Sequence, residues 1–182
     1  MPLARAQLLR RAKKIKLLLM DVDGVLTDGS IYLLAEADGA TRELKAFNSL
    51  DGAGLRLAQR AGLRLGIITG RRSPAVAARA RELELDFLEQ DVFEKLPAYE
   101  KIRRASGFRD EEISFIGDDV TDLPLLLRVG LAVAVPKAHP EARKRAHYVT
   151  RAAGGRGAVR EVIDLLLRAQ GRYHELLRHY LG

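Results

Sequence analysis

The most constraining feature of the sequence is the stretch LLLMDVDGVLTDG at residues 17–29. Its continuous apolar run is typical of a buried strand in a parallel sheet, which we place at residues 15–20. The strand ends directly in Asp21 and Asp23, although carboxylates repel each other and lose hydration on burial. A chain that delivers acids to the end of a buried strand must compensate their charge, and the remaining sequence indicates how.

Strand and helix signals alternate after this run, which predicts an α/β fold with a mostly parallel sheet and helices on both faces. Apolar runs predict further strands at 63–69, 86–88, 112–117, 131–135 and 147–150. Helical spacing of apolar residues and N-cap signals such as Ser73-Pro74 predict helices at about 50–61, 74–83, 95–106, 121–128 and 140–146, and a final one from 158. We therefore expect a single domain over residues 1–182.

Residues 31–47 lack helical periodicity and interrupt this alternation. The segments IYLLA and TRELKAF flank a strong turn signal, Asp38-Gly39, so the stretch is predicted to be a β-hairpin inserted after the first strand. The intervals between the later motifs are too short for a large cap domain. The hairpin is thus the only insertion that the sequence predicts.

Composition limits the function classes. The 182 residues are 47% hydrophobic and include no cysteine, which excludes disulfides and thiolate chemistry and agrees with a cytoplasmic protein. No apolar run reaches the length of a membrane helix, so no membrane partner is expected. The formal net charge of +7 fits either nucleic acid or a small anionic substrate. Because the basic residues are spread along the chain and aromatics make up only 5%, we expect no nucleic-acid partner.

Polar residues follow three of the predicted strands and should meet at one rim of the sheet, where ligands bind in open α/β folds. They are Asp21 and Asp23, then Thr69, Gly70 and Arg71, then Asp118 and Asp119 with Asp122 beyond, and Lys95 opens the intervening helix. Clustered carboxylate oxygens select Mg²⁺ over zinc, and Mg²⁺ commonly works with phosphate. One Asp can then act as nucleophile and another as general acid and base.

Other interpretations of single motifs fail or are weak. An EF-hand calcium loop would need glycine where Leu26 stands and glutamate where Tyr32 stands. A phosphorylated receiver domain also combines acids, Thr and Lys, but its phosphorylated Asp follows a later strand. Thr-Gly after a strand is often only a turn, and a lone Lys95 would usually be a solvated helix residue. The prediction depends on all four motifs occurring in this order.

With DVDGVLTDG, ITGR, Lys95 and GDDVTDLP in order, the chain resembles the haloacid dehalogenase (HAD) superfamily of phosphotransferases. ELKAFNSLDGAG (43–54), GDDVTDLP (117–124) and YVTRAAGGRGAVREVIDLLLRAQG (148–171) resemble, more narrowly, the family of 3-deoxy-D-manno-octulosonate 8-phosphate (KDO 8-phosphate) phosphatases. The resemblance implies a capless, Rossmann-like fold and Mg²⁺-dependent hydrolysis of a sugar phosphate for lipopolysaccharide synthesis. A phosphatase for a nine-carbon sugar acid 9-phosphate, or a non-catalytic HAD-like partner module, stays open as an alternative.

By this resemblance, Asp21 would be the nucleophile and Asp23 the general acid and base. Asp21, the backbone carbonyl of Asp23 and Asp118 would hold Mg²⁺, while Thr69 and Lys95 would bind the transferring phosphoryl group. The residues implied for substrate binding are Asp23, Asn48, Ser49, Leu50, Asp51, Gly52, Arg56, Gly70, Arg71, Arg79, Lys95 and Asp119. Arginine suits the carboxylate of a sugar acid, although Arg56 and Arg79 would also fit a plain surface helix.

The resemblance also implies a homotetramer in which the hairpin at 31–47 packs against neighbours and each subunit helps to cover another's site. Its apolar residues suit such an interface, although a hairpin buried on its own domain is equally allowed. The chain departs from the family at EQDVFEK (89–95), where relatives have a Gly-containing segment before the motif Lys. Residues 172–182 match poorly, and we expect a terminal helix that frays, with entry into a neighbouring site as the alternative.

Overall fold

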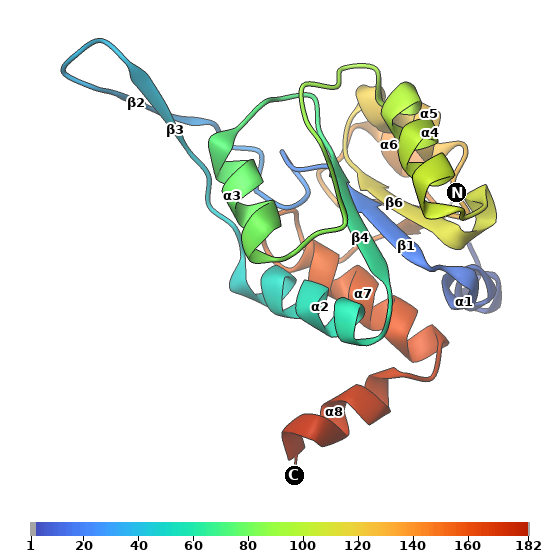
Figure 1. Cartoon of the computed structure of the whole chain (residues 1–182). Coiled ribbons are helices and arrows are strands. Elements are labelled where there is room, and N and C mark those ends of the chain that lie inside the picture. Colours follow the sequence, from blue (N-terminus) through green and yellow to red (C-terminus); the bar gives the residue numbers. More distant parts are fainter. Residues whose placement is uncertain (1–2, 182) are drawn as a thin grey trace.

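The computed structural model describes residues 3–181 of the chain, and within them a six-stranded, fully parallel sheet forms the centre (Figure 1). Its strand order is β5-β4-β1-β6-β7-β8. The strands are β1 (Leu17–Met20), β4 (Arg64–Ile68), β5 (Phe87–Glu89), β6 (Ile113–Gly117), β7 (Leu131–Ala134) and β8 (Tyr148–Val149). The predicted strands and the mostly parallel sheet are confirmed.

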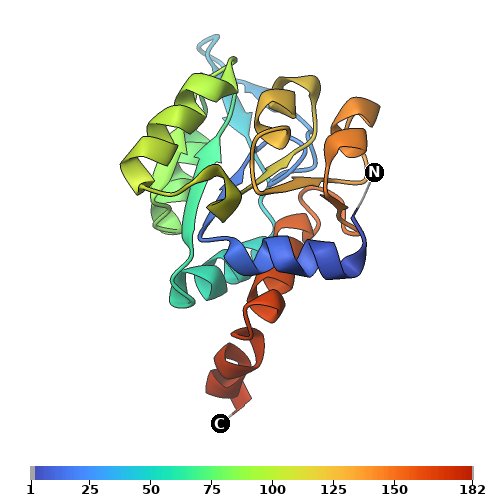
Figure 2. The ribbon, with the colours of Figure 1, turned by 90° about the vertical axis from the view of Figure 1, so that its right-hand side faces the viewer.

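Helices cover both faces of the sheet, which explains why β1, β6 and β7 are buried along their whole length (Figures 1 and 2). On one face, α7 packs against both α1 and α2, and on the other α5 lies between α4 and α6. The helices are α1 (Arg5–Lys14), α2 (Ser49–Arg60), α3 (Pro74–Glu82), α4 (Lys95–Ser106), α5 (Leu123–Leu126), α6 (Pro140–Arg145), α7 (Ala158–Ala169) and α8 (Tyr173–Leu181).

One predicted helix, 121–128, differs in the structure. A 3-10 turn, η2 (Val120–Asp122), comes first and leads into the short helix α5. The side chains of Asp119 and Asp122 accept hydrogen bonds from nearby backbone N–H groups, which fixes this tight start. A second 3-10 turn, η1 (Asp110–Glu112), takes the first residue of the strand predicted at 112–117.

The predicted hairpin is confirmed as an antiparallel pair, β2 (Tyr32–Ala35) and β3 (Thr41–Leu44). It projects from the body of the molecule (Figure 1), so the alternative of a hairpin buried on its own domain is wrong. The turn forms at Asp38-Gly39, where Gly39 has φ = 83° and the Asp38 carboxylate accepts a hydrogen bond from Ala40 N. An isolated two-stranded hairpin is only marginally stable in water, so its base must be held by the domain.

The C-terminal segment forms α8, which projects beyond α7 away from the sheet (Figure 2). Its start is anchored, because Tyr173 and Leu176 pack against the core and the Arg168 guanidinium lies 3.6 Å from the centre of the Tyr173 ring. Whether the helix frays stays a prediction. Among the described residues, none of the helices has the length and apolarity needed to cross a bilayer.

Candidate active site

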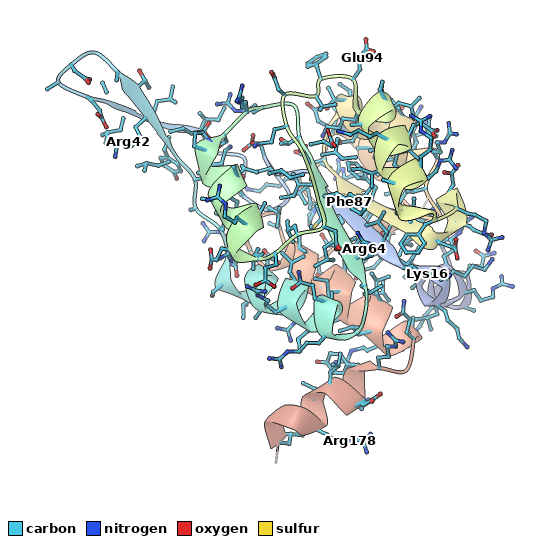
Figure 3. All side chains as sticks on the ribbon, viewed as in Figure 1. Lys16, Arg42, Arg64, Phe87, Glu94 and Arg178 are labelled. Atoms are coloured by element: carbon cyan, nitrogen blue, oxygen red, sulfur yellow. The ribbon has the colours of Figure 1, made fainter. Side chains whose placement is uncertain are left out.

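The site lies at the carboxyl ends of β1, β4 and β6, which are neighbours in the sheet. Asp21 follows β1, Thr69 follows β4 and Asp118 follows β6, so the topology brings together the three motifs that the sequence separates. In Figure 3, Glu94, which precedes Lys95, marks the rim side of the molecule, and Lys16 marks the opposite end of β1.

Asp21 is buried, with 8% of its surface exposed, and both of its carboxylate oxygens have partners. Val22 N donates to Oδ1 at 2.6 Å, and Lys95 Nζ lies 2.9 Å from Oδ2. Burial raises the pKa of Asp21 to about 6 against the opposing effect of Lys95. The carboxylate is thus held in one direction at the centre of the rim.

Lys95 opens α4, and its ammonium is buried between two carboxylates. Its Nζ lies 2.6 Å from Asp122 Oδ1 in addition to its contact with Asp21. Burial alone would lower the pKa of Lys95, but the two negative charges outweigh burial and raise it. Lys95 therefore stays charged and compensates part of the negative charge of Asp21 and Asp122.

An acidic cluster completes the rim. One carboxylate oxygen each from Asp21, Asp118 and Asp122 lies within 4.8 Å of the others. Asp122 is fully buried and its Oδ2 accepts hydrogen bonds from the backbone N–H groups of Asp118 and Asp119. Asp122 thus holds the loop after β6 in place.

Asp118 turns its carboxylate toward the loop after β1. A Cβ built on Gly24 would lie 2.2 Å from Asp118 Oδ2, so only glycine fits there, and Gly24 also has φ = 89°. Burial, followed by the charges of Asp21 and Asp122, raises the pKa of Asp118 to about 8. This electrostatic setting favours a bound cation.

Asp23 lies among cations contributed by other parts of the chain. Lys45 Nζ donates to Asp23 Oδ1, and Arg71 Nε lies 3.7 Å from Asp23 Oδ2. Arg71 also donates to Glu43 Oε2 at 2.7 Å, and the Ser73 hydroxyl donates to Glu43 Oε1. Burial would raise the pKa of Glu43, but these hydrogen bonds and the nearby cations lower it.

Thr69 is buried at the end of β4, and its backbone joins the atypical segment EQDVFEK. Thr69 O accepts from Val92 N at 3.1 Å, and Thr69 N donates to Glu89 O. Asp91 adopts φ = 61°, a left-handed conformation that Asp tolerates better than most residues other than glycine. The chain therefore makes this turn with Asp91 where the resemblance implied a glycine-containing segment. Gly70, next in sequence, is exposed.

Two polar residues of FNSLDG are engaged in the fold itself. Asn48 caps α2 by accepting from Leu50 N, and its Nδ2 donates to Gly155 O. Asp51 is 1% exposed and accepts hydrogen bonds from Gly157 N and Arg160 N at the start of α7. These contacts fix the glycine-rich turn before α7. That turn packs on the loop after β1, since a Cβ on Gly154 would lie 1.7 Å from Gly24 O.

The remaining predicted substrate residues lie around the same helices. Gly52 faces Arg79, whose guanidinium would lie 2.3 Å from a Cβ at that position and which pairs with Glu82 at 2.8 Å. Arg56 donates to Glu82 O and pairs with Glu84 at 3.3 Å, so it joins α2 to the end of α3, whereas the ion pair of Arg79 lies within α3. Ser49, Leu50 and Asp119 are exposed.

The resemblance gave no role to Lys45, Glu43 or Asp122, although Asp122 was among the acids expected at the rim, and the structure brings all three there. Asp122 is the last acid of GDDVTDLP, but the sequence does not predict that its side chain is fully buried. Glu43 lies in β3 and Lys45 directly follows that strand, two positions later, so both side chains reach the same face. That face could be assigned to the site only once the base of the hairpin was located.

Comparison with known proteins gives consistent results. Residues 87–163 match the sequence profile of the haloacid dehalogenase-like hydrolase family. The 3-deoxy-D-manno-octulosonate 8-phosphate phosphatase of Escherichia coli K12 is 46% identical over 170 residues, which cover 93% of this chain and 88% of that protein.

Two solved structures are similar over nearly the whole chain. The phosphatase of the same name from Moraxella catarrhalis, in complex with magnesium ion, phosphate ion and KDO, is 37% identical with a TM-score of 0.91, covering 97% of this chain and 99% of that one. The cobalt-bound form of the Haemophilus influenzae phosphatase is 31% identical with a TM-score of 0.86, covering 94% and 99%. This chain therefore belongs to the haloacid dehalogenase-like hydrolases and, within them, to the family of 3-deoxy-D-manno-octulosonate 8-phosphate phosphatases.

Proposed function

We propose that the protein is a Mg²⁺-dependent phosphatase that hydrolyses KDO 8-phosphate to KDO and phosphate in lipopolysaccharide synthesis. The observation that carries the proposal is the rim itself. A buried carboxylate, Asp21, lies between a charged Lys95 and the Asp118 cluster, in a chain 46% identical to a KDO 8-phosphate phosphatase. This arrangement suits nucleophilic attack on phosphorus.

The residues present fit a magnesium ion. The donors are oxygens only, Gly24 makes room for the Asp118 carboxylate, and burial together with the charges of Asp21 and Asp122 raises the pKa of Asp118 to about 8. Asp21, Asp118 and the backbone carbonyl of Asp23 would hold the ion, and Asp122 would orient the loop. Bound there, Mg²⁺ would offset the negative charge of the phosphoryl oxygens.

In the first step, an Asp21 oxygen attacks phosphorus in line, and the bond from phosphorus to the sugar oxygen breaks. Asp23 donates its proton to that leaving oxygen, so the sugar departs as a neutral alcohol and Asp21 becomes an aspartyl phosphate. Lys95 and the Thr69 hydroxyl would bind the phosphoryl oxygens. Lys95 can do so because its ammonium already contacts Asp21 Oδ2.

In the second step, the same Asp23, now a carboxylate, accepts a proton from water. The water oxygen attacks phosphorus, the bond from phosphorus to Asp21 breaks, and inorganic phosphate leaves. Both protein groups return to their starting state. One carboxylate can serve as acid and then as base because it gives up a proton in the first step and takes one up in the second.

For the sugar carboxylate, we propose Arg71 as the main partner, since its side chain is about half exposed at the rim beside Asp23. Gly70 would allow the substrate to approach the protein backbone closely, and Ser49, Leu50 and Asp119 present exposed side chains. Arg56 would contribute mainly by joining α2 to the end of α3, and Arg79 by its pair with Glu82 within α3, beside Gly52. Asn48 and Asp51 would contribute by fixing the adjoining turn.

The test is phosphate release from KDO 8-phosphate with Mg²⁺ and with EDTA. We expect Mg²⁺-dependent release that exceeds release from a nine-carbon sugar acid 9-phosphate at equal concentration. Faster turnover of the nine-carbon substrate would favour that alternative function. Absence of release from every sugar phosphate would favour a non-catalytic partner module.

We further propose a cytoplasmic homotetramer in which hairpins of neighbouring subunits meet. Supporting this, the hairpin carries exposed apolar side chains, with Leu33 65% and Leu34 52% exposed, joined by Ile31, Tyr32 and Leu44. Light scattering of the wild type against a Leu33→Asp, Leu34→Asp double variant would test the assembly, since the charged variant should dissociate. Cell fractionation would test the location.

A further inference from the structure

The hairpin contributes a buried ammonium to the site. Lys45 follows β3, and only 1% of its side chain is exposed, although the strands of the hairpin are largely exposed. Its Nζ donates to Asp23 Oδ1 and lies 3.8 Å from Glu43 Oε1. A buried ammonium is unfavourable unless carboxylates compensate it, so the base of the hairpin and Asp23 stabilise each other.

Glu43 links this contact to the loop after β4. It accepts hydrogen bonds from Arg71 Nη2 and from the Ser73 hydroxyl, which also caps α3. Asp23, Lys45, Glu43 and Arg71 therefore form a closed set of alternating charges from three separate segments of the chain. Such networks restrict the rotamers of their members more than isolated pairs do.

The two oxygens of Asp23 differ in this set. Oδ1 is bound by Lys45, whereas Oδ2 lies 3.7 Å from Arg71 Nε, which is beyond hydrogen-bonding distance. Oδ2 is therefore the oxygen that can carry a proton to a leaving group. Lys45 holds the opposite oxygen, Oδ1.

We propose that Lys45, supported by Glu43, is a positioning residue for Asp23, which aims Oδ2 at the sugar oxygen and couples the hairpin to the chemical step. This inference rests on the proposed function, in which Asp23 is the acid and base. Lys45 is not assigned a contact with the substrate. Its effect passes through Asp23, and that indirect action is what distinguishes it from a binding residue.

The test is a double-mutant cycle on kcat and KM, using wild type, Lys45→Met, Asp23→Ala and the double variant. We expect Lys45→Met to lower kcat about 10- to 100-fold with KM changed less than about threefold, since general acid catalysis contributes about 10² to 10⁴. In the Asp23→Ala background the same change should alter kcat less than about threefold. Lys45→Arg should recover part of the rate.

Equal losses from Lys45→Met in both backgrounds, or a loss confined to KM, would overturn the proposal, the latter in favour of substrate binding. Glu43→Gln provides a second route should Lys45→Met not fold, as judged by circular dichroism, with a smaller loss that also vanishes in the Asp23→Ala background. Lys14→Met, which removes the exposed pair with Glu111, is the matched control.

The two proposals fail separately. Should wild type hydrolyse KDO 8-phosphate while Lys45→Met keeps its full rate, the positioning role is wrong and the proposed function stands. Should wild type hydrolyse only a simple alkyl phosphate, the substrate is wrong, and the same cycle on that alkyl phosphate still decides the role of Lys45.

Discussion

The two ends of β6 carry acids whose pKa values are shifted in opposite directions. Glu112, just before the strand, bonds to Lys16 Nζ at 2.7 Å and to Arg109 N at 2.9 Å, and these contacts lower its pKa to about 2. Asp118 lies just after the strand, and burial and the neighbouring carboxylates raise its pKa to about 8. Lys16 marks the first of these ends in Figure 3.

The difference separates a structural acid from one prepared for a ligand. At Glu112 the protein supplies its own donors, so the carboxylate stabilises the fold. At Asp118 the protein gathers carboxylates that Lys95 compensates only in part, and in the proposed function a bound Mg²⁺ would offset the rest. Perturbed pKa values of this second kind concentrate at functional sites.

The strongest way to break the comparison is Asp21→Asn, which removes the proposed nucleophile from the rim. We expect kcat to fall by at least about 10³-fold, since loss of a covalent nucleophile leaves only binding and electrostatic effects. The midpoint of thermal unfolding should stay the same or rise, because a buried charge is removed. A variant with near wild-type turnover would show that Asp21 is not the nucleophile.

Asp118→Asn should affect magnesium rather than the fold. The amide keeps the shape of the side chain but loses the charge, so we expect a drop of about 10²-fold in turnover at limiting Mg²⁺, partly recovered at high Mg²⁺. Rates measured across a magnesium titration check this. A magnesium dependence identical to that of wild type would contradict the assigned ligand.

The metal-free protein should lose stability as pH rises. Asp21 and Asp118 have folded pKa values of about 6 and 8, above their unfolded values. The native state therefore binds more protons than the unfolded state between about pH 4 and pH 8. Their contribution is present at about pH 4 and is lost as pH rises through 8. Urea unfolding in EDTA at several pH values measures it, and Asp118→Asn should flatten the slope. An unchanged slope in the variant would rule out Asp118 as its source.

At the other end of β6, Glu112→Gln should destabilise the fold without affecting catalysis. The expected loss is about 1–2 kcal/mol, typical of charge-assisted hydrogen bonds to a partly buried carboxylate. Because the folded pKa of Glu112 is lowered, its contribution is present at neutral pH and lost as pH falls toward 2. Denaturant unfolding at pH 7 and pH 3 checks both points. An altered kcat would contradict the prediction that Glu112 acts on the fold alone.

The smallest expected effect is that of Lys14→Met. Its ion pair with Glu111 is 3.4 Å long and largely exposed, and such pairs contribute little to stability. We expect no resolvable change in unfolding midpoint or in turnover. A clear loss would show that exposed charge at this end matters as much as the buried partners of Glu112.

Much of the fold could be predicted because local signals agreed with the global arrangement. The apolar run before Asp21, the Asp38-Gly39 turn and Ser73-Pro74 each predicted an element that the structure contains. Parallel topology then implied that Asp21, Thr69 and Asp118 share one rim. Side-chain partners could not be predicted in the same way, because they depend on contacts between distant segments.

Asp51 and Lys45 are two examples of side chains whose partners the sequence did not predict. The motif match pointed to Asp51 as a substrate residue, yet its carboxylate is engaged with the backbone at the start of α7, more than a hundred residues later. Lys45 lies within the segment ELKAFNSLDGAG that carries the resemblance but was given no role there, yet its ammonium reaches Asp23. Neither pairing follows from periodicity, propensity or spacing.

The central claim is that Asp21 becomes transiently phosphorylated while a divalent cation is held beside Asp118. A crystal structure with Mg²⁺ and beryllium trifluoride, which mimics a phosphoryl group on a carboxylate, tests it most directly. We predict the fluoride complex bonded to an Asp21 oxygen, with magnesium contacting Asp21 and Asp118. The account would be contradicted by an unmodified Asp21 with the complex or the ion bound elsewhere.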